Sequence, residues 1–108
     1  MPAEMLEPID QSAIVVNLTD TFLNWVNFTD DSPNMTLQSI NDENHVYLIP
    51  EYENDKELES YLKKNYLVIF ENELMAWWTD PDGWPKKRTY TLFKEFFHIE
   101  KNSMVFEI

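Results

Sequence analysis

The fold is decided by residues 54–78, which read NDKELESYLKKNYLVIFENELMAWW. Large apolar side chains recur here at intervals of three and four residues, a spacing that places them on one face of an α-helix. They are Leu58, Tyr61, Leu62, Tyr66, Ile69, Phe70, Leu74, Trp77 and Trp78. Asn54 followed by Glu57 is typical of a helix N-terminus, and the residue before Pro81 disfavours helix. The pattern predicts one long helix over about 55–78, roughly 35 Å in length.

Three other stretches predict β-strands. Residues 13–18 and 45–49 are short runs rich in β-branched and apolar side chains, which are typical of strands buried on both faces. Pro50 ends the second run, because proline lacks the amide hydrogen that a sheet needs. Residues 98–108 alternate in polarity, so we expect a strand with one solvated face. In that strand Met104, Phe106 and Ile108 point to one side, and Val105 and Glu107 to the other.

Two shorter helices and a long loop complete the pattern. A helix is expected over about 20–28, and Thr89 can cap another. The inner face of that second helix is formed by Leu92, Phe93, Phe96 and Phe97. Residues 29–44 are polar and contain Pro33, which predicts a long loop with a single helical turn at 37–40.

The elements follow in the order β-α-β-α-α-β. This order predicts an α+β or small α/β domain, in which a three-stranded sheet packs against one long helix and one or two shorter ones. The chain of 108 residues has the length of one domain. Residues 1–12 show no periodicity, so we expect a loose leader there and a single globular domain over 13–108.

The chain contains one glycine, Gly83, in a turn at residues 80–85. Glycine adopts a positive φ without steric cost, so we expect a positive φ at Gly83. A single glycine also excludes the P-loop and the dinucleotide-binding fingerprint, because both need several glycines close to a phosphate. The Gly-x-Ser-x-Gly motif of serine hydrolases is excluded on the same ground.

The net charge of −12 is unevenly distributed. Residues 1–55 contain eleven carboxylates and no lysine or arginine, whereas residues 56–108 contain nine carboxylates and all eight basic residues. The acidic residues of the loops around the second strand are Asp30, Asp31, Asp42, Glu43, Glu51, Glu53 and Asp55. We expect them to form one acidic face that attracts a basic protein and speeds its association. Ordinary solvation of an acidic protein is the alternative interpretation.

The composition argues against several other classes of protein. Binding to nucleic acids or anionic membranes needs clustered lysines and arginines, so we expect neither partner. The hydrophobic content of 44% is too high for a disordered acidic chain. The chain has no cysteine, which excludes disulfides and thiolate ligands. Without a membrane-spanning run or the pattern of a signal peptide, a cytoplasmic location is expected.

Paired carboxylates support a second hypothesis, a small enzyme that uses a metal ion or two carboxylates. Asp80 and Asp82 resemble the start of a calcium loop, but the third ligand position and the distal glutamate are missing. Glu73 falls near the apolar stripe of the long helix, where a hydrogen-bonded structural carboxylate is the simpler interpretation. We expect such a site near Asp80, Asp82 and Glu73, lined by Trp77, Trp78 or Trp84.

The two histidines do not indicate a metal centre. His45 and His98 lie at the ends of predicted strands and lack the His-x-x-x-His spacing of zinc proteases. We therefore assign no metal ligand, catalytic residue or cofactor from the sequence.

One loop concentrates aromatic and basic side chains, namely Trp84, Lys86, Lys87 and Arg88. Tryptophan and arginine dominate binding hot spots, so a contact patch is one interpretation. The other, which we favour, is that Trp84 anchors the loop in the core while the bases balance the acidic charge.

Several short motifs together resemble a group of small bacterial proteins of unknown function. These motifs are Phe22-Leu23-Asn24-Trp25, Val46-Tyr47-Leu48-Ile49-Pro50-Glu51, Phe70-Glu71-Asn72-Glu73-Leu74 with Trp77, Trp84-Pro85, Phe93 with Phe96-Phe97, and Ser103-Met104-Val105. The resemblance covers about residues 13–107, with Phe96 standing where that group carries tryptophan. It implies a bacterial cytosolic protein and supplies no catalytic residue.

Overall fold

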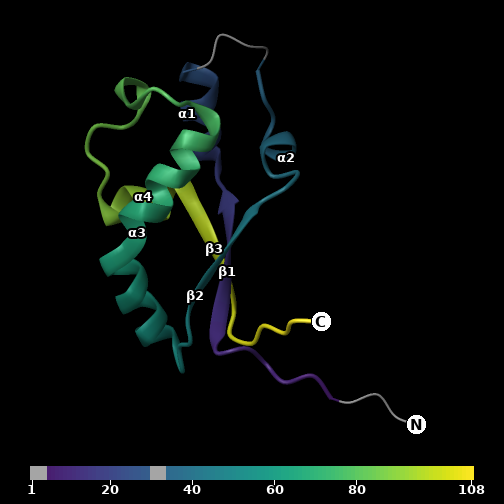
Figure 1. Cartoon of the computed structure of the whole chain (residues 1–108). Coiled ribbons are helices and arrows are strands. Elements are labelled where there is room, and N and C mark those ends of the chain that lie inside the picture. The colour runs from purple at the N-terminus through teal and green to yellow at the C-terminus, as the bar shows by residue number, and fades with distance from the viewer. Residues whose placement is uncertain (1–4, 30–33) are drawn as a thin grey trace.

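The computed structural model describes residues 5–29 and 34–108 and has an α+β fold (Figure 1). Its elements are β1 (Gln11–Leu18), α1 (Asp20–Thr29), α2 (Leu37–Ile40), β2 (His45–Pro50), α3 (Asp55–Trp77), the 3₁₀ turn η1 (Pro81–Gly83), α4 (Tyr90–Phe96) and β3 (Phe97–Asn102). The long helix and the helical turn at 37–40 are confirmed. Asn54 and Thr89 cap α3 and α4 by accepting backbone amide hydrogens from Glu57 and Leu92.

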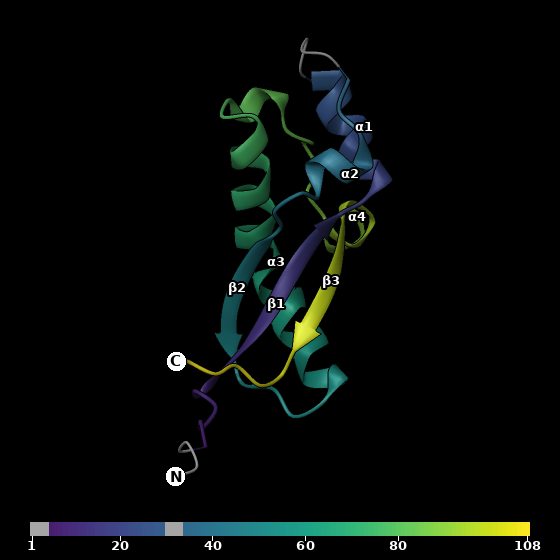
Figure 2. The same ribbon diagram turned by 90° about the vertical axis from the view of Figure 1, so that its right-hand side faces the viewer.

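The three strands form one antiparallel sheet in the order β2-β1-β3. Because β1 and β2 run in opposite directions, α1 is not a crossover between parallel strands, and the α/β alternative is excluded. β1 is the central strand, and β2 and β3 are the two edges. Figure 2 shows this order, with α3 behind the sheet.

The helices α3 and α4 cover one face of the sheet, and the other face is largely open (Figures 1 and 2). The prediction that residues 45–49 are buried on both faces is wrong, because Val46 and Leu48 are 61% and 54% exposed. Their side chains alternate with those of Tyr47 and Ile49, which pack toward the helices. β2 therefore presents apolar side chains on the open face of the sheet.

Phenylalanine rings fill the space between the sheet and the helices. The Phe70 ring of α3 lies 5.3 Å, between centroids, from the rings of both Phe96 and Phe97. Phe22 of α1 packs edge-on against Phe96 at 5.8 Å. Such angled contacts between rings are more favourable than a face-to-face sandwich. Because the contacting rings come from α1, α3 and α4, these helices share one core.

The boundaries differ from the predicted ones at both ends of the domain. β3 ends at Asn102, and the predicted continuation to residue 108 is wrong. Beyond Asn102 the chain pairs instead with the segment before β1, where the Ile9 amide donates to the Val105 carbonyl over 2.8 Å. The leader is shorter than predicted, since β1 begins at Gln11 and Ser12 is fully buried.

Gly83 does not have a positive φ, so that expectation is wrong. Its lack of a side chain matters for a different reason. A Cβ atom at this position would lie 2.5 Å from the Trp78 indole nitrogen and 3.3 Å from a methyl group of Thr29. Glycine therefore lets η1 approach α1 and the end of α3 closely. The same close approach allows the Trp25 indole of α1 to donate to the Gly83 carbonyl over 2.9 Å.

None of the helices that the structure describes is both long enough and apolar enough to cross a membrane.

Candidate functional site

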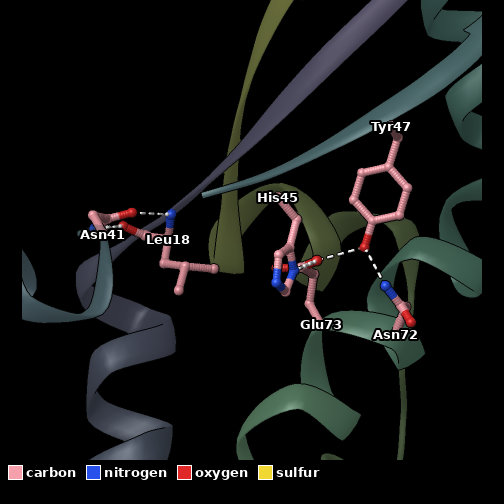
Figure 3. Close-up of polar contacts among 6 residues, drawn as sticks. All are labelled: Leu18, Asn41, His45, Tyr47, Asn72 and Glu73. Carbon is pink, nitrogen blue, oxygen red and sulfur yellow. Dashed lines mark hydrogen bonds and ion pairs between the residues drawn. The ribbon is translucent and has the colours of Figure 1, made fainter. Parts of the chain in front are cut away.

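A buried carboxylate joins β2 to α3. Glu73 on α3 is only 2% exposed, and its Oε2 atom lies 2.7 Å from Nδ1 of His45. The Tyr47 hydroxyl donates to the same oxygen, and Asn72 donates to the Tyr47 hydroxyl oxygen over 2.8 Å (Figure 3). We refer to His45, Tyr47, Asn72 and Glu73 as the Glu73 cluster. It attaches the edge strand to the long helix through hydrogen bonds that satisfy a buried acidic group.

Burial raises the pKa of the Tyr47 phenol above its ordinary value of 10.0. Asn72 opposes this increase in pKa by donating a hydrogen bond, and the Glu73 carboxylate adds to it. The folded protein thus favours protonated Tyr47, a donor to Glu73. This contribution to stability is complete below about pH 10, the pKa of an unfolded tyrosine, and is lost as the pH rises toward the folded-state pKa.

The wild-type protein is therefore expected to lose stability above about pH 10 more steeply than the Tyr47→Phe variant, which has no phenol to ionise at this position. Urea denaturation of both proteins at a series of alkaline pH values measures the difference. Parallel decreases in the free energy of unfolding would contradict a raised pKa of Tyr47 in the folded protein.

The Asn41 side chain acts as a strand partner for the end of β1. The Leu18 amide donates to Asn41 Oδ1 over 2.8 Å, and Asn41 Nδ2 donates to the Leu18 carbonyl over 2.9 Å (Figure 3). Leu18 thus directs its backbone groups to the β2 side. By the alternation of an antiparallel ladder, Tyr47 exchanges hydrogen bonds with β1, while Val46 and Leu48 direct their backbone groups outward. Within residues 5–29 and 34–108, no strand pairs with this outer edge.

Two cavities lie side by side between β2 and α3. One of about 230 Å³ is lined by Tyr47, Leu48, Ile49, Tyr61, Asn65, Val68 and Ile69. The other, of about 560 Å³, is lined by Tyr47, Val68, Glu71, Asn72, Met75 and Trp84. Because both are lined by Tyr47 of β2 and Val68 of α3, the two cavities adjoin, and we call them together the β2–α3 groove. A third cavity, of about 150 Å³, lies beside Glu73, His45 and Trp77.

The acidic residues predicted to form one face lie at the two ends of β2. Asp42 and Glu43 precede the strand and form the upstream acidic pair, whereas Glu51 and Glu53 follow it and form the downstream acidic pair. A six-residue strand separates the two pairs by about 20 Å. The described acidic residues thus form two groups, with an uncharged strand edge between them.

The other predicted members of the acidic face have different positions. Asp55, at the start of α3, forms an ion pair with Lys101 of β3, which offsets its charge. Asp30 and Asp31 lie outside the described residues.

The basic loop is mostly structural. Trp84 is buried, and its indole nitrogen donates to the Trp78 carbonyl over 2.7 Å. The Arg88 guanidinium lies over the Trp84 ring and pairs with Glu71 at 3.1 Å. Lys86 and Lys87 are exposed. The interpretation of Trp84 as a core anchor is confirmed, and only the two lysines remain free to make contacts with a partner.

The three carboxylates of the predicted enzyme site have separate roles. Asp80 caps η1 by accepting the Asp82 amide hydrogen over 3.0 Å, and Asp82 is exposed. Glu73 is held by His45 and Tyr47 and lines the small cavity together with Trp77, as predicted for that tryptophan. Within the part of the chain that the structure describes, no three histidine or acidic side chains are arranged to hold a metal ion.

The groove wall on α3 was not predicted from the sequence. Tyr61, Asn65, Val68, Asn72 and Met75 follow one another at intervals of four, three, four and three residues, which places them along one side of the helix. The spacing is present in the sequence, but the apolar stripe that forms the core is the stronger pattern of the same helix.

Comparisons with protein-family models, with curated proteins and with solved structures found no match to this chain.

Proposed function

We propose that this protein is a cytoplasmic interaction module that binds a basic segment of a partner protein along β2. One observation carries the proposal: among the described residues, the outer edge of β2 pairs with no other strand and lies between two acidic pairs. An interaction surface with an apolar centre and charged ends favours a segment with the complementary pattern.

The charge distribution of the domain supports a basic partner. The described residues before Lys56 include no lysine or arginine, so intramolecular ion pairs with Asp42, Glu43, Glu51 and Glu53 would need bases from the C-terminal half. The lysine and arginine ion pairs in the described part of the chain join Arg88 to Glu71 and Lys101 to Asp55 instead. The acidic pairs thus remain available to a partner and can attract it over about 8 Å at physiological salt.

Binding is expected to depend on salt and on the position of the carboxylates. The probe is a short synthetic peptide with two lysines at each end and alternating valine and threonine between them, which we call the lysine-flanked peptide. A variant with Asp42→Asn, Glu43→Gln, Glu51→Gln and Glu53→Gln should bind it at least about tenfold more weakly, since several surface ion pairs are lost together. Titration calorimetry at about 0.1 M and about 1 M salt measures both effects.

The matched control neutralises four exposed carboxylates elsewhere, by Glu7→Gln, Asp82→Asn, Glu95→Gln and Glu107→Gln, and has the same net charge. It should bind the lysine-flanked peptide like the wild type. Equal loss in both variants would mean that only the overall charge matters and would overturn the proposal, as would affinity independent of salt.

A carboxylate-using enzyme is the second candidate function. It is favoured by the cavity beside Glu73, a buried acidic side chain whose Oε2 atom already holds two donors. Asp80 and Asp82 do not line that cavity, so this candidate now depends on Glu73 alone. The effect of Glu73 on stability, considered in the Discussion, separates the two candidates.

A further inference from the structure

We propose that the partner segment binds in an extended conformation and adds to β2 as a fourth strand, with alternate side chains in the β2–α3 groove. This inference rests on the proposed function and specifies how the basic segment is held. Addition of a strand to an exposed sheet edge provides affinity through backbone hydrogen bonds and specificity through pockets for alternate side chains.

The backbone of β2 supplies the hydrogen-bonding edge. Val46 and Leu48 direct their amide and carbonyl groups away from β1, where an added strand would meet them. Pro50 has the same orientation in the ladder, so its missing amide hydrogen costs the sheet nothing. The edge thus offers two residues whose backbone can both donate and accept.

The groove supplies apolar contacts next to that edge. Val68 is 73% exposed and Met75 is also exposed, although both belong to a helix whose opposite side is deeply buried. Tyr61 continues the same line seven residues before Val68. The side chains of an added strand would alternate between this groove and the open face, where Val46 and Leu48 are exposed. Apolar residues in the centre of the segment therefore suit both sides.

The charges argue against a second copy of this chain as the occupant. Two β2 strands paired antiparallel would place the upstream acidic pair of one copy beside the downstream acidic pair of the other. Like charges directly opposite in a sheet are destabilising. A segment with basic ends and an apolar centre instead places opposite charges beside both acidic pairs, which attracts the segment at both ends.

The other edge of the sheet is a poor match for the same segment. The cavity next to β3 is lined by two acidic residues, Asp55 and Glu59, and by two lysines, Lys94 and Lys101, of which Lys101 pairs with Asp55. It therefore offers no excess of acidic charge to a basic segment. The two edges therefore provide a comparison within one molecule.

Proline substitutions at the two edges test strand addition. Leu48→Pro removes an outward amide hydrogen of β2 at an exposed position, and Lys101→Pro does the same on β3, where the alternation also directs the amide outward. We expect Leu48→Pro to weaken binding of the lysine-flanked peptide about tenfold. Addition of the peptide to this variant should leave amide hydrogen exchange in β2 unchanged. Lys101→Pro should bind the peptide at least as tightly as the wild type does. Thermal denaturation of each variant checks that the fold is retained.

A second measurement does not depend on changing the protein. Two forms of the lysine-flanked peptide are N-methylated at alternate amides, one form at odd and one at even positions. An added strand uses only one set of its amides to pair with β2, so one form should lose binding at least about tenfold and the other should retain it. With the wild type, hydrogen exchange at Val46 and Leu48 should slow when the unmethylated peptide binds.

The outcomes separate this inference from the proposed function. Equal binding of the two methylated forms, or unchanged exchange at β2, would overturn strand addition while leaving salt-dependent binding intact. Absence of binding of the unmethylated peptide to the wild type at about 0.1 M salt would overturn both.

Discussion

Replacing Phe70 with alanine is expected to lower the free energy of unfolding by about 3–5 kcal/mol. The Phe70 side chain is fully buried and contacts the rings of Phe93, Phe96 and Phe97. The truncation removes apolar contacts and leaves a cavity that rigid aromatic neighbours cannot fill. Domains of this size have a total stability of about 5–15 kcal/mol, so the variant should be close to unfolding.

Urea denaturation followed by circular dichroism measures this loss, and Val68→Ala is the matched control. Val68 lies two positions away on the same helix and is largely exposed, so its truncation should change the stability by no more than about 0.5 kcal/mol. A similar small loss for Phe70→Ala would contradict the assignment of Phe70 to the centre of the core.

Replacing Glu73 with alanine is expected to cost about 3 kcal/mol, because His45 and Tyr47 both lose their acceptor and a small cavity is added. Glu73→Gln keeps an acceptor oxygen of nearly the same shape and should cost about half as much. Combining each substitution with Tyr47→Phe gives two double-mutant cycles, and in each we expect a coupling free energy of about 1 kcal/mol. Thermal and urea denaturation of the wild type and the five variants provide the values.

The sign of the Glu73 effect also separates the two candidate functions. A structural carboxylate that attaches β2 to α3 stabilises the protein, so its removal destabilises. Carboxylates retained for catalysis are often held at a cost, and their removal then raises stability. An increase in the melting temperature of Glu73→Gln would therefore contradict the structural role and favour the carboxylate-using enzyme.

If Glu73 is structural, it also shapes the proposed binding edge. Tyr47 lines the β2–α3 groove, and Glu73 lines the small cavity beside His45 and Trp77. The hydrogen bond between Tyr47 and Glu73 holds β2 against α3. A strand held in place needs little reordering when a partner segment pairs with it, which lowers the entropic cost of binding.

Local patterns in the sequence were sufficient for most secondary structure. The three-and-four spacing of residues 54–78 and the caps at Asn54 and Thr89 depend on neighbours within a few residues, and α3 and α4 appear where these signals place them. The errors occurred where burial depends on distant elements. The run 45–49 looks like a strand buried on both faces, but α3 and α4 cover only one face of the sheet and leave Val46 and Leu48 exposed on the other.

The candidate site was harder to predict than the fold. The acidic residues around β2 are visible in the sequence, and they form two groups because the extended six-residue strand holds its two ends about 20 Å apart. The contact between Glu73 and the residues of β2 joins positions separated by 28 and 26 residues. No local pattern encodes such a pairing, because it arises from how α3 lies across the sheet.

The sequence by itself determined the order of the helices and strands, the long helix, the helical caps and the acidic character of the first half of the chain, and it favoured a buried role for Trp84. These properties follow from composition and from periodicities of a few residues. Only the tertiary structure decided between the α+β and α/β classes, and it set the antiparallel order β2-β1-β3, the free edge of β2 and the burial of Glu73. Each of these depends on which distant surfaces meet, and that choice is made by the packing of the whole domain around its aromatic core.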